Sequence, residues 1–433
     1  MGFLLVALLP FAQGNHVFAA AIQDKTPPPA EFRRGEIVDR NGVTLAHDVV
    51  VHSLEITIEK PPVLSEQDEL IDRLAAIIAI TPGDRARFYE KNSRNYMFRA
   101  EPIRDRLSRE EVARFIEQRH RFPNVAVKER LVREYPHGTL ASHLIGYIGR
   151  ISEKDVERIE ARGETAKYRD TEKIGKAGVE ATYEADLHGK PTGGKIELTM
   201  DIELQKAAEA AFGKRRGALV AIEPASGEVL ALASMPTFDP NLFVDGISGP
   251  DWRMLSESPD KPLLNRAISR AYPPGSTFTP FMALAGLAAG KRTVNQSYPD
   301  PGGFQFDNHF FKDSKKGGHG MVNLHKSIVV SCDTYYYVLA NDLGIDAIAA
   351  SMAWFGLGAR TGVDLPGEGA GFLPSPAWKL KYFKTREQQK WYAGETISVG
   401  IGQGYNAYTP IQMANALAAV VNGGKLMRPR VVR

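Results

Sequence analysis

Two apolar segments joined by a short turn constrain the fold of this chain more than any other feature. Gly217–Glu223 and Gly227–Ala233 are rich in Ala, Val, Leu and Ile, and Pro224–Gly227 between them has the composition of a tight turn. This pattern predicts two antiparallel strands. Just upstream, residues 196–200 are strand-like, and Asp201 is placed to cap a helix that follows it. A sheet mixed with helices predicts an α/β or α+β domain that begins near residue 196.

The composition excludes several classes of protein. Of the 433 residues, 43% are hydrophobic and 24% are charged, as in soluble globular domains, which argues against a disordered chain or one with many membrane spans. The 54 basic and 51 acidic residues give a formal net charge of +3, so no nucleic-acid partner is expected. Cys332 is the single cysteine, so an internal disulfide is excluded and its thiol needs another explanation.

The region before residue 195 combines helix and turn signals in a charged background. Asn41-Gly42 predicts a tight turn between two strands. Ser65 precedes a helical pattern that we expect Pro82-Gly83 to end. Ser108 and Ser152 each open a capping-box sequence, with an acidic residue three positions later. These signals predict an α+β domain ahead of the apolar strands.

The first residues form an apolar run that has three interpretations. Residues 3–12 are too short to cross a bilayer, which takes about 20 residues. An extension to Ile22 includes Pro10 and several polar residues, and no basic residue precedes the run. Residues 1–23 therefore fit a degraded or clipped membrane anchor, a signal-like segment or a buried core helix.

Ser276 is the candidate nucleophile. It follows Pro273, Pro274 and Gly275, and we expect it to begin a helix that continues through Met282. Backbone N–H groups and the helix dipole at such a position favour a developing oxyanion. A serine after Pro-Gly is usually only a helix cap, so the stretch by itself leaves both interpretations open.

Several motifs in a fixed order resemble the class B penicillin-binding proteins, and most closely the penicillin-binding protein 2 family of rod-shape peptidoglycan synthesis. The resemblance runs from the first motif to the last residue. The motifs are Arg34-Gly-Glu-Ile-Val-Asp-Arg-Asn-Gly42, Lys176-Ala-Gly-Val-Glu180, Tyr272-Pro-Pro-Gly-Ser276, Gly317-Gly-His-Gly320, Ser331-Cys-Asp333, Gly400-Ile-Gly-Gln-Gly-Tyr405 and Thr409-Pro-Ile-Gln412. The resemblance implies an N-terminal dimerisation or pedestal domain over residues 24–195. It implies a β-lactamase/transpeptidase-like α/β domain with an antiparallel sheet over residues 196–433.

The resemblance also implies an activity. Ser276 would attack the penultimate D-alanine carbonyl of a peptidoglycan stem peptide and pass the acyl group to a neighbouring amine, and β-lactams would acylate the same serine. In the second family motif, Ser331 would relay a proton and Asp333 would help to hold the loop. The implied partners are stem peptides, the lipid-linked precursor and elongation-complex membrane proteins such as a SEDS-type glycosyltransferase. The implied location is the bacterial inner membrane, with the domains facing the periplasm.

One departure from the family pattern concerns the base that activates the serine. The family lysine, one helical turn after the nucleophile, is Thr279 here. General-base assistance contributes ~10²–10⁴-fold, so we expect acylation of Ser276 to be badly impaired. A second Ser-x-x-Lys pattern, Ser258-Pro-Asp-Lys261, is followed at once by a proline, and we interpret it as a loop.

The other departure concerns the third family motif, Lys-Ser/Thr-Gly, which has no match on a strand. Arg360-Thr-Gly362 is similar, but the residues after it predict a turn. The chain stops at Arg433, where family members continue, so we expect a truncated transpeptidase domain with an exposed apolar face. A non-catalytic binding module is the alternative hypothesis for this chain.

A zinc site is the hypothesis for the lone cysteine. Two carboxylates, an imidazole and a thiolate can form a tetrahedral zinc site, but these spacings match no compact finger pattern. From the residues alone, a surface histidine and a buried cysteine are the alternative. The resemblance implies the zinc, because members of the family bind a structural zinc near the active site through two Asp, one His and one Cys. The matching positions are Asp300, Asp313, His319 and Cys332. His309 and His325 are nearby competitors for the imidazole.

Overall fold

The computed structural model describes residues 33–58, 64–92, 100–169, 171–188 and 194–433. These residues form two compact units made of alternating segments. The described residues of the first lie within Met1–Gly35, Asp48–Val132 and His188–Gly194, and those of the second within Glu36–His47, Arg133–Leu187 and Lys195–Arg433. The predicted limits at residues 23 and 195 stay a prediction, and the apolar run at 1–23 lies outside the described residues. Among the residues described, no helix is both long and apolar enough to cross a membrane.

The first unit is a small α+β body. The distal half of β2 (Thr44–Thr57) pairs antiparallel with β3 (Ala100–Arg104), with Ile56 opposite Glu101. The helices beside these strands bury one apolar face each, and the core includes Leu54, Leu74, Phe88 and Phe115. The other elements are α2 (Leu64–Ala75), α3 (Pro82–Asn92), α4 (Arg109–Gln118), η2 (Arg119–Arg121) and β4 (Val125–Glu134).

The helix signals read from the sequence are mostly confirmed. Ser108 caps α4, with the backbone N–H of Glu111 donating to its Oγ at 3.2 Å and the Glu111 carboxylate accepting the N–H of Ser108 at 2.8 Å. Ser152 forms the same box ahead of α6 (Glu153–Ala161). The prediction that Pro82 ends a helix is wrong. The preceding helix already ends at Ala75, and Pro82 is the first residue of α3, where its missing N–H costs nothing.

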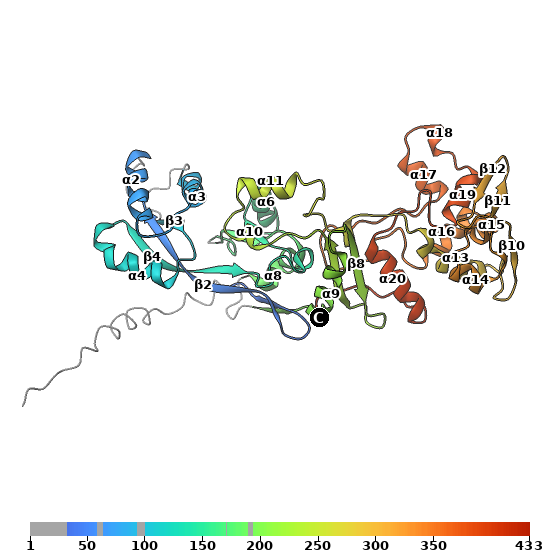
Figure 1. Ribbon diagram of the computed structural model, residues 1–433, viewed down its shortest axis with the longest axis horizontal. Helices are drawn as coiled ribbons and strands as arrows, with labels where there is room; N and C mark the ends of the chain where they lie inside the picture. The colour runs from blue at the N-terminus through green and yellow to red at the C-terminus, as the bar shows by residue number, and fades with distance from the viewer. Residues whose placement is uncertain (1–32, 59–63, 93–99, 170, 189–193) are drawn as a thin grey trace, which may run out of the picture. The chain divides into compact units, whose positions relative to one another are not determined.

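The second unit contains the predicted strand pair (Figure 1). β8 (Gly217–Ile222) and β9 (Val229–Met235) are antiparallel, with Leu219 opposite Ala233. Helix α9 (Ile202–Phe212) packs on β9, and Asp201 caps it by accepting the N–H groups of Glu203 and Leu204. Helix α20 (Pro410–Val421) packs against β8. The predicted strand near residue 196 is β7 (Lys195–Glu197), which pairs parallel with β1 (Glu36–Val38).

A helical part of the second unit lies next to the candidate nucleophile. Helices α13 (Thr279–Ala288), α15 (Asp333–Leu343), α16 (Ile345–Ala353) and α19 (Ala393–Val399) share a core that includes Phe278, Met282, Tyr336, Ile348 and Ile397. Two antiparallel ribbons lie beside α15 (Figure 1). They are β10 (Tyr298–Asp300) with β13 (Gly320–Val322), and β11 (Gly303–Phe306) with β12 (His309–Lys312).

The remaining elements are short connectors of the second unit. They are α5 (Ser142–Ile145), β5 (Ile148–Arg150), β6 (Lys173–Gly175), α7 (Gly178–Thr182), α8 (Glu184–Leu187), α10 (Asn241–Val244), α11 (Gly249–Ser256), α12 (Arg266–Ser269), η3 (Gly275–Phe278), α14 (Leu324–Val329), α17 (Pro376–Tyr382) and α18 (Arg386–Gln389). The α+β body followed by helices on antiparallel strands confirms the predicted fold class.

Candidate active site and metal centre

Ser276 lies in the 3-10 turn η3, one turn before the α-helix that we expected it to begin. Helix α13 starts at Thr279, with Pro280 in its first turn. Gly275 enters this turn with φ +55°, a conformation that glycine adopts without strain. The Pro-Pro-Gly sequence therefore places the serine on a tight bend at the edge of the helical core.

Ser331 is the polar partner of Ser276. The two serines are 55 positions apart in the chain, and the Ser331 hydroxyl donates to the Ser276 Oγ at 2.7 Å. Ser331 connects α14 to α15 and has φ +53°, which is uncommon for a residue with a Cβ. A strained backbone that aims a hydroxyl at another hydroxyl is typical of a built site rather than of a random surface contact.

Thr279 stands where the family has its lysine base, and its hydroxyl is bonded to the backbone. Its side chain is buried, and its hydroxyl donates to the backbone carbonyl of Ser276 at 2.9 Å. A threonine hydroxyl cannot accept a proton as a base at neutral pH. Within the described part of the chain, the Ser276 hydroxyl has a hydrogen bond to Ser331 and no bonded cationic side chain.

The glycine-rich segment at residues 400–404 holds the nucleophile turn from the other side. The Gly275 N–H donates to the Gly402 carbonyl at 3.0 Å. Gly402 has φ +71°, and a Cβ there would lie 2.3 Å from the Gly275 carbonyl oxygen. Only glycine allows this approach, and apart from the resemblance no pattern in the sequence indicated the contact.

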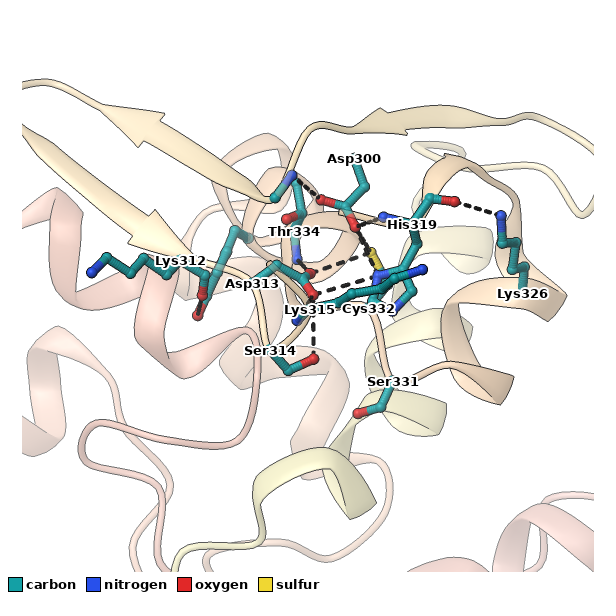
Figure 2. Close-up of polar contacts among 12 residues, drawn as sticks. Asp300, Lys312, Asp313, Ser314, Lys315, His319, Lys326, Ser331, Cys332 and Thr334 are labelled. Carbon is teal, nitrogen blue, oxygen red and sulfur yellow. Dashed lines mark hydrogen bonds and ion pairs between the residues drawn. The ribbon is translucent and has the colours of Figure 1, made fainter. Parts of the chain in front are cut away.

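Four predicted ligands meet at one point (Figure 2). Their donor atoms all lie within 4.8 Å of one another. The Cys332 Sγ is 3.4 Å from Asp300 Oδ2 and 3.6 Å from Asp313 Oδ2. The His319 Nδ1 is 2.8 Å from Asp300 Oδ2 and 3.4 Å from Asp313 Oδ1. Donors at about 2.0–2.3 Å from a tetrahedral zinc would be about 3.3–3.7 Å apart, so three of these four distances suit such an ion.

Backbone N–H groups and one lysine hold the ligands in place. Asp300 accepts the N–H of Gly302 at 2.8 Å and that of His319 at 2.7 Å. Asp313 accepts the N–H of Thr334 at 2.8 Å. The Lys326 ammonium donates to the His319 carbonyl at 2.7 Å (Figure 2). Sequence reasoning missed Thr334 and Lys326, because their roles depend on tertiary contacts.

The electrostatics of the cluster suit a cation. Backbone and side-chain hydrogen bonds outweigh burial and lower the pKa of Asp300 to about 2, and they also lower the pKa of Asp313. Burial, followed by the charges of these two carboxylates, raises the pKa of the Cys332 thiol. Two fixed negative charges beside a buried thiol are an unfavourable set unless a positive charge offsets them. A divalent ion would do so and would favour the thiolate.

Asp333 belongs with this cluster rather than with the two serines. Burial, followed by the charge of Asp313, raises its pKa to about 6. No hydrogen bond joins its side chain to Ser276 or Ser331 in the residues that the structure describes. It is the first residue of α15, so its carboxylate lies at the positive end of that helix.

The competing motifs are not part of either site. Ser258 and Lys261 lie in a loop, as predicted. Arg360-Thr-Gly362 is irregular backbone in which the N–H groups of Thr361 and Gly362 donate to the carboxylate of Glu368, so this segment is no sheet strand. His309 is exposed on β12 with its ring against Phe311, and His325 is exposed on α14. Neither histidine is in the four-ligand set.

Comparison with known families identifies the architecture. The penicillin-binding protein dimerisation domain matches residues 29–221, and the penicillin binding protein transpeptidase domain matches residues 217–433. The fold and the hydrogen-bonded serine pair therefore place this chain in the class of penicillin-binding serine proteins. The chain belongs to the penicillin-binding protein family, with penicillin-binding protein 2 (MrdA) homologues as its relatives.

The curated relatives match over most of this chain. Peptidoglycan D,D-transpeptidase MrdA of Acinetobacter baumannii is 42% identical over 94% of the chain, and MrdA of Escherichia coli K12 is 40% identical over 93%. The chain spans 62% and 67% of the length of these two relatives. Penicillin-binding protein 2 from Helicobacter pylori has a TM-score of 0.82 and 29% identity, covering 93% of this chain and 78% of that one. A complex of Pseudomonas aeruginosa PBP2 with WCK 5153 has a TM-score of 0.70 and 36% identity, covering 93% of this chain and 72% of that one.

Proposed function

We propose that this chain carries the acyl-serine site of a peptidoglycan D,D-transpeptidase, with Ser276 as the nucleophile. The observation that carries the proposal is the 2.7 Å hydrogen bond from Ser331 to the Ser276 Oγ, made from a left-handed backbone position. The Ser276 Oγ attacks the penultimate D-alanine carbonyl, terminal D-alanine leaves, and an amine of a second stem peptide takes the acyl group. Ser331 relays the proton, and the backbone N–H of Ser276 contributes to the oxyanion hole. β-Lactams acylate the same oxygen.

Thr279 sets the rate at which this site works. Without a base one turn after the nucleophile, acylation is slower by ~10²–10⁴-fold than in a Ser–Lys site. The alternative function, a binding module without turnover, is favoured by this same residue, because its hydroxyl is already bonded to the Ser276 carbonyl.

A fluorescent penicillin distinguishes the two functions. Slow covalent labelling that Ser276→Ala abolishes supports the transpeptidase site. Ser258→Ala is the matched control, because it removes the serine of the other Ser-x-x-Lys pattern and should leave labelling unchanged. Absence of labelling in the parent chain and in Thr279→Lys, even after long incubation, would support the binding module.

We propose that Asp300, Asp313, His319 and Cys332 hold one structural zinc ion. Support comes from the 4.8 Å limit on their donor separations and from the burial of both carboxylates and the thiol. All four coordination positions would be filled by protein, so the ion ties the 300–320 loop to the second motif and takes no substrate. Its charge holds the Cys332 sulfur as thiolate.

Elemental analysis tests the zinc directly. We expect about one equivalent in purified protein and a strong reduction in Cys332→Ser. Zinc below about a tenth of an equivalent, unchanged by that substitution, would contradict the proposal. Chelation should lower the melting temperature of the parent chain and should not change the melting temperature of Cys332→Ser.

The partners and the location follow from the proposed reaction. Stem peptides and the lipid-linked precursor are exposed outside the inner membrane, so we propose a periplasm-facing, membrane-associated protein. The H. pylori relative was solved in a complex with MreC, and another related structure is described as a peptidoglycan synthase complex. We propose membrane proteins of the elongation complex, including a SEDS-type glycosyltransferase, as partners. Co-purification from membranes tests this, with the chain found alone as the contradicting result.

A further inference from the structure

A cavity of about 330 Å³ lies in the second unit, among residues that the acyl-serine site and the four-ligand cluster do not use. Its volume is at the lower end of the range for small-molecule sites. One wall is Lys176-Ala-Gly178, the first half of a motif that the proposed chemistry leaves without a role. Other lining residues come from two more segments, residues 263–265 with 268–269, and residues 365–367.

The lining is mostly apolar and includes two aromatic rings. Phe238 and Tyr147 meet edge to face with centroids 5.8 Å apart, and Tyr147 also stacks on Phe243. Leu263, Leu264 and Ile268 complete the apolar surface. Rings fixed in this way form rigid walls that fit a flat apolar molecule with little ordering cost. The Lys176 ammonium is paired with Asp155, so the charge is already neutralised there.

His143 is the polar group that gives this cavity a chemical preference. The residue is 7% exposed, lines the cavity, and has its Nε2 2.8 Å from the Pro262 carbonyl oxygen. A carbonyl only accepts, so Nε2 carries the proton. Burial lowers the pKa of His143 to about 4, which keeps the ring neutral. The Nδ1 is then a bare acceptor, and it has no hydrogen-bond partner among the residues described.

We propose that this cavity binds a small, flat apolar molecule that carries one N–H or O–H group, and that this group donates to the Nδ1 of His143. An apolar occupant packs against the rings, and its donor pairs with a ring nitrogen to which no described residue is hydrogen-bonded. An anion is disfavoured, because a neutral imidazole acceptor repels it. This site is separate from acyl transfer at Ser276 and from the four-ligand cluster.

Indole and benzofuran are matched probes, because they have nearly the same shape and differ in N–H against ring oxygen. Titration followed by protein NMR should show indole binding about 3–10-fold more tightly, the effect of one hydrogen bond. His143→Phe should bring indole to the level of benzofuran, and Ala177→Leu should fill the cavity and weaken both. His143→Leu, which also lacks an acceptor in its side chain, serves if the phenylalanine variant does not fold.

Equal binding of the two probes would overturn the proposal, as would binding that Ala177→Leu does not change. The absence of any binding up to the solubility limit of indole would also overturn it, and would show that the cavity holds only solvent.

Discussion

At the scale of single residues, the two serines and their neighbours decide what the site can do. Ser331 has a hydrogen bond to Ser276, and Thr279 is bonded to a backbone carbonyl instead of to the nucleophile. These contacts position the Ser276 hydroxyl, and neither side chain is a base that could remove its proton. We therefore expect the first step, acylation of Ser276, to be slow.

Ser331→Ala should slow β-lactam acylation of Ser276 about 10-fold or more, because the Ser276 Oγ loses the neighbouring hydroxyl that is proposed to relay its proton. The free energy of unfolding should change little, since Ser331 is only half-buried. Stopped-flow labelling compared with urea unfolding measures both. A Ser331→Ala protein that acylates at the parent rate would remove Ser331 from the proton path.

His143 makes a pH-dependent contribution to stability that is separate from catalysis. Its pKa falls from 6.5 to about 4 on folding, because burial disfavours the imidazolium. The unfolded chain therefore binds more protons between these values. The free energy of unfolding falls as pH drops through that window, by about 2–3 kcal/mol at pH 4.5.

His143→Gln checks this contribution, because glutamine keeps a donor for Pro262 and does not titrate. Urea unfolding at pH 7.5 and at pH 4.5 should show a smaller loss in the variant than in the parent. The same loss in both proteins would contradict the assignment to His143.

At the scale of elements, close backbone contacts hold the short segments that carry chemistry. Gly402 and Gly404 both have positive φ, but only a Cβ at Gly402 would meet a backbone oxygen at 2.3 Å. At Gly404 the nearest atom would be the Cβ of Ser398 at 3.4 Å. Alanine substitutions at the two glycines therefore separate the free-energy cost of the positive φ from the free-energy cost of the contact with Gly275.

Gly404→Ala should cost about 1 kcal/mol for the left-handed conformation, and Gly402→Ala about 1–3 kcal/mol more for the clash. Gly402→Ala should also slow acylation, since the displaced Gly275 precedes the nucleophile. Thermal unfolding and penicillin labelling measure the two effects. Equal stability of the two variants would show that the 400–404 segment does not press on the nucleophile turn.

The motif at residues 176–180 also holds a buried ion pair. The Arg133 Nε donates to the Glu180 carboxylate at 2.8 Å, and the Tyr135 hydroxyl donates to it at 3.1 Å. Both charged side chains are buried. Glu180→Gln should therefore lower the free energy of unfolding by about 3–5 kcal/mol, because a buried guanidinium loses its counter-charge.

Glu203→Gln is the matched control for this pair. Glu203 pairs with Lys206 on an exposed helix face, where such a pair contributes about 0.3–0.5 kcal/mol. Urea unfolding of both variants gives the comparison. Similar small losses would mean that the buried pair is not a structural requirement.

At the scale of the whole molecule, patterns in short stretches of sequence predicted the helices and strands. The resemblance predicted which distant site residues these helices and strands bring together. The β8–β9 pair, the Asp201 cap and the capping boxes were readable because each depends on residues close in sequence. The Ser276–Ser331 bond and the four-ligand cluster join distant segments, and only the family motifs indicated them. The Gly402 contact, the Lys326 bond and the His143 cavity were not predictable, since they depend on how segments that are distant in sequence pack together.

The most direct test of the central claim is mass-spectrometric mapping of a β-lactam adduct over time in the parent chain and in Thr279→Lys. We expect a single adduct on the peptide that contains Ser276, formed slowly in the parent and ~10²-fold or more faster when the lysine is restored. We expect no adduct in Ser276→Ala. An adduct on another residue, or one that persists in Ser276→Ala, would contradict the assignment of Ser276 as the nucleophile.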